Sequence, residues 1–141
     1  LSALAAFILV GPVHLSLVGF FAGVALFIIG VSLNTLIALS IGLMAFWTEE
    51  TSAYRWMYDK LNWVLGGVFI PLAVFPEQYK KIVDLLPFGQ MFYHPALMMV
   101  KFNAHEFVKS IGVLLVWIII LSLIISFIYK KGAKNLSING G

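Results

Sequence analysis

Charged residues are unevenly distributed along the chain, and none occurs between Leu1 and Thr48. A single membrane crossing needs about 20 apolar residues, so this stretch is too long for one simple crossing. Gly11-Pro12 offers a natural break, because proline lacks the N–H that a helix interior needs and glycine tolerates turn geometry. We therefore predict the end of a truncated span at Leu1–Val10 and a long or tilted span at Leu15–Trp47.

A polar patch at 48–52 separates this span from the next predicted helix. That helix carries Arg55 and Asp59 at i,i+4 spacing, where opposite charges attract. The following uncharged run, Leu61–Pro76, is short for a full crossing. We predict a span at Ala53–Phe75 whose first turns lie at the membrane interface, where aromatic side chains anchor helices.

Prolines divide the next segment into short pieces. Pro76, Pro87 and Pro95 break the stretch from Phe75 to Phe107. The piece between the first two prolines has one apolar and one charged side, and Pro95 suits the first position of a second short helix that runs to about Lys101. Neither piece can cross a bilayer, so we expect residues 76–107 to lie in the interface or to form a re-entrant segment outside the cytoplasm.

The last predicted span is Ser110–Tyr129, which is uncharged and is followed by Lys130, Lys131 and Lys134. Basic residues are enriched in cytoplasmic loops, so the tail 130–141 is predicted to be cytoplasmic. Counting backwards places 76–107 outside and the segment Thr48–Lys60 inside. Five basic residues then fall inside and four outside, so charge alone gives this orientation little weight.

Composition agrees with a chain that lies mostly in lipid. Hydrophobic residues make up 62% and charged residues 11%, whereas soluble domains carry about 25% charged residues. The predicted fold class is therefore all-α, a single polytopic transmembrane domain over 1–141 with short re-entrant helices before the last span. Because an apolar stretch begins at once with Leu1, we interpret the chain as a fragment without its N-terminal spans.

The sequence offers little for catalysis, metal binding or nucleic acid. Cysteine is absent, and a net charge of +3 comes without a basic stripe, so disulfides and nucleic-acid binding are not expected. No P-loop motif for ATP occurs. His105-Glu106 lacks the second histidine of a zinc-protease helix. We therefore expect no catalytic residue, no metal site and no cofactor in this chain.

Gly66, Gly67 and Pro71 form the most informative local motif. The Pro71 ring would clash with the Gly67 carbonyl in a continuous helix, and paired glycines allow another helix to approach closely. The motif indicates either a kink in a gating helix or tight packing at a helix end, and the two are compatible.

Four polar residues are candidates for a transport pathway or an inner gate. Asn34 and Asn62 interrupt apolar runs, so each is expected to face a neighbouring helix or a wet cavity. Packing and substrate contact both remain open for them. Arg55 and Asp59 lie where a span meets the cytoplasm, and they form either a solvated face or part of an inner gate.

Several short Gly, Pro and Phe motifs follow one another in a recognisable order. They are Ala45-Phe46-Trp47-Thr48, Gly66-Gly67, Ile70-Pro71-Leu72, Phe75-Pro76, Leu86-Pro87-Phe88, Tyr93-His94-Pro95-Ala96 and the terminal Asn139-Gly140-Gly141. In this order the chain resembles permeases of the ABC-2 exporter class, in particular a bacterial subfamily of six-span subunits. The family usually has Phe-Pro where this chain has His94-Pro95.

The resemblance implies an architecture and a set of partners. In that family short external re-entrant helices precede the last span. The signature residues, here Gly66, Gly67, Pro71, Pro76, Pro87, Phe88 and Pro95, are architectural or gating candidates. Two permease subunits, like or unlike, would dock on two separate ABC ATPase subunits that bind ATP and Mg, within the cell membrane. In that family the main segments that contact the ATPase lie nearer the N-terminus of the permease. Most of the ATPase contact would therefore be missing from this fragment.

We therefore predict a membrane-spanning permease subunit of an ATP-driven exporter. The transported substrate remains open. Two other classes are considered beside it. A membrane-embedded enzyme would require His94, His105 and Glu106 to converge on one cavity, and a non-catalytic scaffold would require no such site.

Overall fold

The computed structural model describes residues 16–70 and 72–139, and all its regular elements are helical. The predicted remnant at Leu1–Val10 and Pro71 lie outside the described residues. The helices are α2 (Leu17–Leu43), α3 (Ser52–Leu65), α4 (Glu77–Leu85), α5 (Pro87–Met91), α6 (Tyr93–Val100) and α7 (Ala104–Asn139). The prediction of an all-α membrane domain is confirmed.

Two helices, α2 and α7, are long and apolar enough to cross a bilayer. The qualifying stretches are Leu17–Phe46 and Ala104–Gly132, so long apolar helices lie where the spans Leu15–Trp47 and Ser110–Tyr129 are predicted. Both helices leave many large apolar side chains exposed, including Phe21 and Leu123. Such surfaces are favourable in lipid and costly in water.

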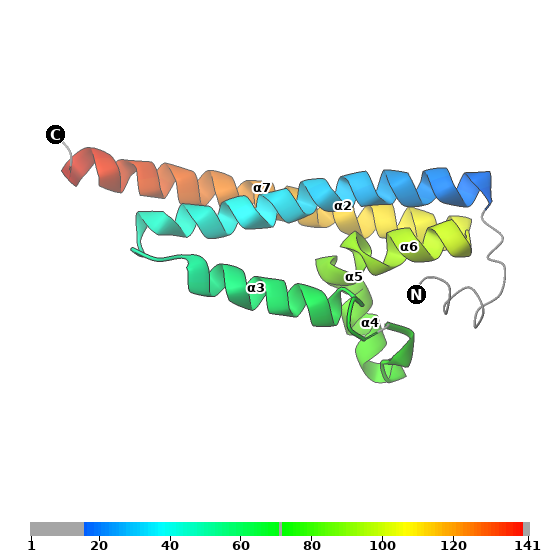
Figure 1. Cartoon of the computed structure of the whole chain (residues 1–141). Helices are drawn as coiled ribbons and strands as arrows, with labels where there is room; N and C mark the ends of the chain where they lie inside the picture. The colour runs from blue at the N-terminus through cyan, green and yellow to red at the C-terminus, as the bar shows by residue number, and fades with distance from the viewer. Residues whose placement is uncertain (1–15, 71, 140–141) are drawn as a thin grey trace, which may run out of the picture.

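The two long helices lie side by side and point the same way, as Figure 1 shows. Their C-terminal parts meet, because the rings of Phe46 and Tyr129 are 6.5 Å apart. The chain must therefore return along the bundle between the end of α2 and the start of α7. It returns in two pieces: α3 covers the first part of the way and α6 the last part (Figure 1).

The predicted span at Ala53–Phe75 is wrong as a single helix. Helix α3 ends at Leu65 after 14 residues, which corresponds to about 21 Å at 1.5 Å per residue and is short of the ~30 Å hydrocarbon core. Gly67, the next residue but one, has φ of 79°, in the left-handed region. A helix cannot continue through that conformation, and glycine adopts it without steric cost.

Three short helices lie in the proline-divided segment, where the sequence predicts two. Helix α4 follows Pro76 as predicted, and α5 is an additional helix. Pro87 is the first residue of α5, and Leu86 before it is extended. Helix α6 begins at Tyr93, two residues before Pro95. Its start is earlier than expected because a proline is tolerated throughout a first turn, where N–H groups have no helical partner.

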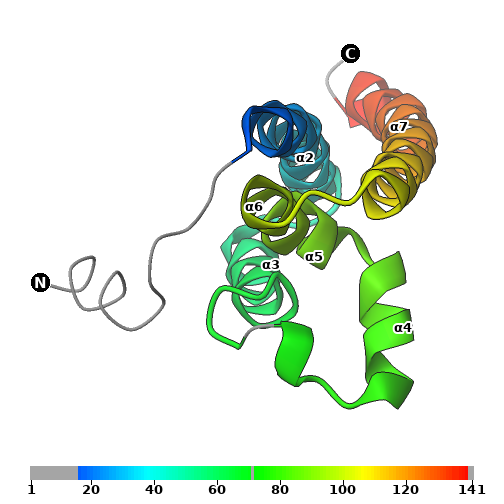
Figure 2. The same ribbon diagram turned by 90° about the vertical axis from the view of Figure 1, so that its right-hand side faces the viewer.

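Glycines on α2 allow the short helices to approach it closely. A Cβ atom on Gly19 would lie 2.7 Å from the Met98 carbonyl oxygen, and one on Gly30 would lie 3.0 Å from Met91 Cα. The end-on view in Figure 2 shows α6 against α2, with α4 set apart from the long helices. Around this contact the buried core gathers Leu26, Leu33, Met91, Met98, Leu114 and Leu121.

We predict that Gly23→Val destabilises this contact. A Cβ atom on Gly23 would lie 2.6 Å from the Pro95 carbonyl oxygen, and overpacking of this kind costs about 1–3 kcal/mol. The free energy of unfolding can be followed by circular dichroism during SDS titration in mild detergent. Gly42→Val is the matched control, because nothing lies within 4 Å of a Cβ there. Equal losses in the two variants would contradict the close contact.

Candidate functional site

Gly66 and Gly67 form the break between α3 and the short helices. A Cβ on Gly66 would lie 3.3 Å from the Phe92 ring, and one on Gly67 would lie 3.1 Å from the Tyr93 ring. The glycines therefore end α3 and also allow the start of α6 to pack against that end. The predicted clash with Pro71 lies outside the described residues, and a gating role for these glycines stays a prediction.

Three of the other predicted residues meet around one tyrosine. The Tyr58 hydroxyl donates a hydrogen bond to Asn34 Oδ1 over 2.5 Å and so links α3 to α2. Asn62 lies one turn further along α3 and is also buried. The Phe88 ring of α5 is 6.2 Å from the Tyr58 ring. Tyr58 is one of the aromatic residues in the first turns of α3, and its i,i+4 spacing from Asn62 puts both on one helix face.

The Arg55–Asp59 pair is present and largely exposed. Arg55 Nε lies 3.4 Å from Asp59 Oδ1, and the two side chains are 48% and 42% exposed. Exposed pairs of this kind contribute little to stability. The pair therefore forms part of a polar surface on α3, and a role in an inner gate stays a prediction.

A network of charged and polar side chains that the sequence did not reveal joins α4, α6 and α7. Asp84 is its centre: its Oδ2 lies 3.6 Å from Lys109 Nζ, and its Oδ1 lies 3.6 Å from His94 Nε2. Lys109 also lies 3.7 Å from Glu106 Oε2. Asp84 and Lys109 are 25 positions apart, so helix periodicity alone could not pair them.

His94 is buried at this network, outside the two span-length helices. Burial lowers the pKa of the imidazole below its usual value, and the Asp84 carboxylate opposes this shift without cancelling it. The ring is therefore neutral at neutral pH, with Asp84 paired mainly to Lys109.

The histidines do not converge as a membrane-embedded enzyme would require. The His94 side chain is 7% exposed, whereas that of His105 is 86% exposed and reaches only Glu106. Within residues 16–70 and 72–139, no group of three or more His, Asp or Glu side chains could hold a metal ion.

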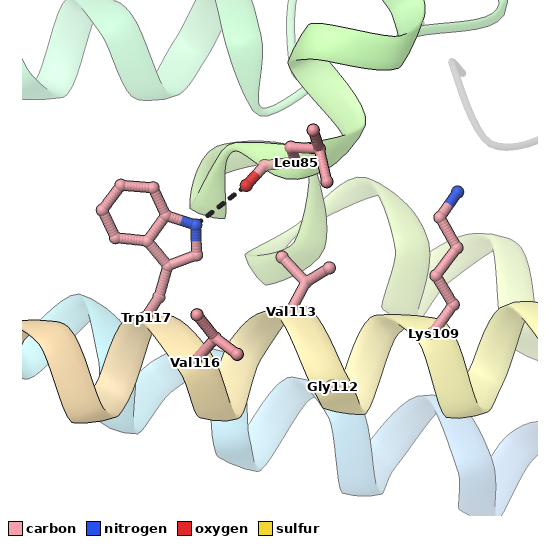
Figure 3. A pocket seen from close by; sticks show the side chains of 6 residues that line it. All are labelled: Leu85, Lys109, Gly112, Val113, Val116 and Trp117. Carbon is pink, nitrogen blue, oxygen red and sulfur yellow. Dashed lines mark hydrogen bonds between the residues drawn. The ribbon is translucent and has the colours of Figure 1, made fainter.

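The C-terminal end of α4 is fastened by two hydrogen bonds. Trp117 Nε1 of α7 donates to the Leu85 carbonyl over 2.8 Å, and Gln90 Nε2 of α5 donates to the Asp84 carbonyl over 2.8 Å. Beside this attachment lies a groove of about 330 Å³. Figure 3 shows its lining, which consists of Leu85, Lys109, Gly112, Val113, Val116 and Trp117.

A second apolar groove, of about 400 Å³, lies along α3. Its lining residues are Trp56, Met57, Lys60, Leu61, Val64 and Leu65. Trp56 and Met57 are 63% and 58% exposed. A helix face with this much apolar surface is typical of contact with lipid or with another protein.

Comparison with known families decides the identity of the chain. The family described as ABC-2 family transporter protein matches residues 3–140. The chain belongs to the ABC-2 transporter family. Searches of curated proteins and of solved structures find no match.

Family membership confirms the predicted resemblance and assigns the chain to a membrane transport component, which is not itself catalytic. An ABC-2 transporter component is associated with a membrane and with an ABC ATPase. The exposed apolar faces of α2 and α7 agree with a membrane location.

We predict that Tyr58→Phe weakens the contact between α2 and α3 in this ABC-2 chain. The variant loses the hydrogen bond to Asn34 and leaves that amide oxygen without this donor. The free energy of unfolding in mild detergent should fall by about 1 kcal/mol. Tyr54→Phe is the control, because Tyr54 is 41% exposed on the same helix. A similar loss in both variants would show that the hydrogen bond contributes nothing specific.

Proposed function

We propose that this chain belongs to the membrane-spanning permease subunit of an ATP-driven exporter. It would form the translocation pathway with a second permease subunit, like or unlike, while separate ABC ATPase subunits bind ATP and Mg. The observation that carries the proposal is the family match over residues 3–140. No residue of this chain is assigned to covalent chemistry.

The apolar face of α3 supports a pathway shared with a second subunit. Trp56, Met57, Leu61 and Val64 are all exposed along it. Lys60 lies at the same face, with its Nζ 3.9 Å from the centre of the Trp63 ring. This exposed face would meet the partner or the pathway. Asn34 of α2, through its hydrogen bond with Tyr58, and the buried Asn62 would support α3 from behind.

The break at Gly66 and Gly67 would be the place where α3 moves. It separates the two pieces of the return path, so α3 could tilt without displacing α6 from α2. Pro76, Pro87, Phe88 and Pro95 would maintain the short helices on the other side of the break. ATP binding can drive such a change only if the nucleotide-bound state favours one arrangement over the other.

We propose an orientation in which residues 48–60 and the tail 130–141 are cytoplasmic and residues 76–107 are extracytoplasmic and re-entrant. The contact between Phe46 and Tyr129 supports this, because the polar segments that follow these residues then share one side. The pairing of Asp84 with Lys109 supports it further, because Lys109 precedes the uncharged run of α7 at the opposite end.

The function is tested by co-purification and by ATP hydrolysis. A P-loop ATPase encoded beside this chain is expected to co-purify with the full-length permease in mild detergent. The rate of ATP hydrolysis by the complex should increase when compounds of one class are added, the classes being amphiphilic drugs, lipids, peptides and glycans.

Gly67→Val should abolish this stimulation and leave co-purification intact, because a β-branched residue is strained at a φ of 79°. Gly42→Val is the control. Failure to recover an ATPase would overturn the proposal.

The orientation is tested by cysteine labelling, since these 141 residues contain no cysteine of their own. Lys80→Cys should react with a membrane-impermeant maleimide in intact cells. Lys130→Cys should react only after the membrane is permeabilised. The reverse pattern would overturn the proposed orientation and leave the transport assignment standing.

A further inference from the structure

The groove between the end of α4 and α7 has the form of a binding site for one chain of a lipid. Gly112 leaves its floor open, because no atom lies within 4 Å of a Cβ built there. Trp117 forms one wall, and its indole N–H is held by the Leu85 carbonyl, so the ring is fixed in place. Figure 3 shows Trp117, Val113 and Lys109 along one side of α7, with Leu85 facing them.

The apolar path continues beyond the groove along the same side of α7. Val116, Ile120, Leu123 and Phe127 follow one another at spacings of three or four residues and are all exposed. Side chains at this spacing form a continuous stripe on a helix. An acyl chain that enters over Gly112 can therefore lie in contact with α7 over several turns.

Charges at the other end of the groove determine which headgroup fits. Lys109 lies 3.6 Å from Asp84 Oδ2 and 3.7 Å from Glu106 Oε2. A headgroup with only negative charge would meet two carboxylates beside one ammonium. A headgroup with a phosphate and a primary ammonium is complementary to both, because the phosphate can approach Lys109 while the ammonium donates hydrogen bonds to a carboxylate.

We propose that this groove binds one aminophospholipid, such as phosphatidylethanolamine. Its phosphate lies at Lys109, its ammonium at Glu106 or Asp84, and one acyl chain over Gly112 beside Trp117. The bound lipid covers the hydrogen bond and the ion pair that fasten α4 to α7. This site goes beyond the proposed function, because lipid binding requires neither nucleotide nor a transported substrate.

The test is native mass spectrometry of the full-length protein in its complex, with phosphatidylethanolamine, phosphatidylcholine and phosphatidylglycerol supplied at equal concentrations. We expect one phosphatidylethanolamine per chain to be retained in preference to the other two. Gly112→Leu should weaken its retention about tenfold or more, because the leucine side chain occupies the place of the acyl chain. Gly42→Leu is the matched control, since Gly42 also has open space at its Cβ and lies away from the groove.

Two further experiments test the headgroup contacts and the acyl-chain contacts separately. Lys109→Gln should remove the preference among the three lipids. Phosphatidylethanolamine with brominated acyl chains should quench tryptophan fluorescence in the wild type, and this quenching should diminish in both Trp117→Phe and Gly112→Leu. Equal retention of all three lipids, or preference for phosphatidylglycerol, would overturn the headgroup assignment. Unchanged retention of phosphatidylethanolamine in Gly112→Leu would overturn the lipid site itself. Dissociation of a second protein chain from that variant would also overturn it, because a protein chain would then be the occupant of the groove.

Discussion

The close approach of α6 to the glycines of α2 is the contact on which the rest of the structure depends. In lipid, helices gain little from the hydrophobic effect when they meet, because acyl chains are as apolar as leucine side chains. Association then depends on fit, and Gly19, Gly23 and Gly30 allow backbone atoms of the short helices to lie directly on α2. With α6 held there, α5 and the end of α4 come within reach of α7, and Asp84 and Trp117 complete the connection.

The parallel course of α2 and α7 explains why the segment between them is broken. A parallel pair requires a return path, and here α3 and α6 share it, with the short helices α4 and α5 between them in the chain. Exposed helix ends are costly in hydrocarbon, because their N–H and C=O groups find no water. The chain limits this cost by placing the ends against protein, with Gly66 and Gly67 on Phe92 and Tyr93. Mobility at such a place is compatible with a transport cycle.

The sequence predicted those features that depend on local pattern. Uncharged runs predicted α2 and α7, and the apolar and charged sides of the segment after Pro76 predicted α4. The prediction of one helix over Ala53–Phe75 is wrong because the uncharged run that begins at Leu61 contains Gly67, whose positive φ prevents the helix from continuing. The contacts of Asp84 depend on folding across 25 positions and left no local signal. The glycines at 19 and 23 do leave a local signal, since Gly-x-x-x-Gly in an apolar helix is a packing motif.

The common direction of α2 and α7 has an electrical consequence. Each helix carries partial negative charge at its C-terminal end and partial positive charge at its start. Because the two helices run the same way, these dipoles add along the bundle instead of cancelling. Helix α2 ends at Leu43, beside the part of α7 around Tyr129, whereas α7 continues to Asn139. Lys130 and Lys131 follow Tyr129 directly, so they provide positive charge near the negative end of α2. These basic residues within α7 thus compensate the field of a neighbouring helix.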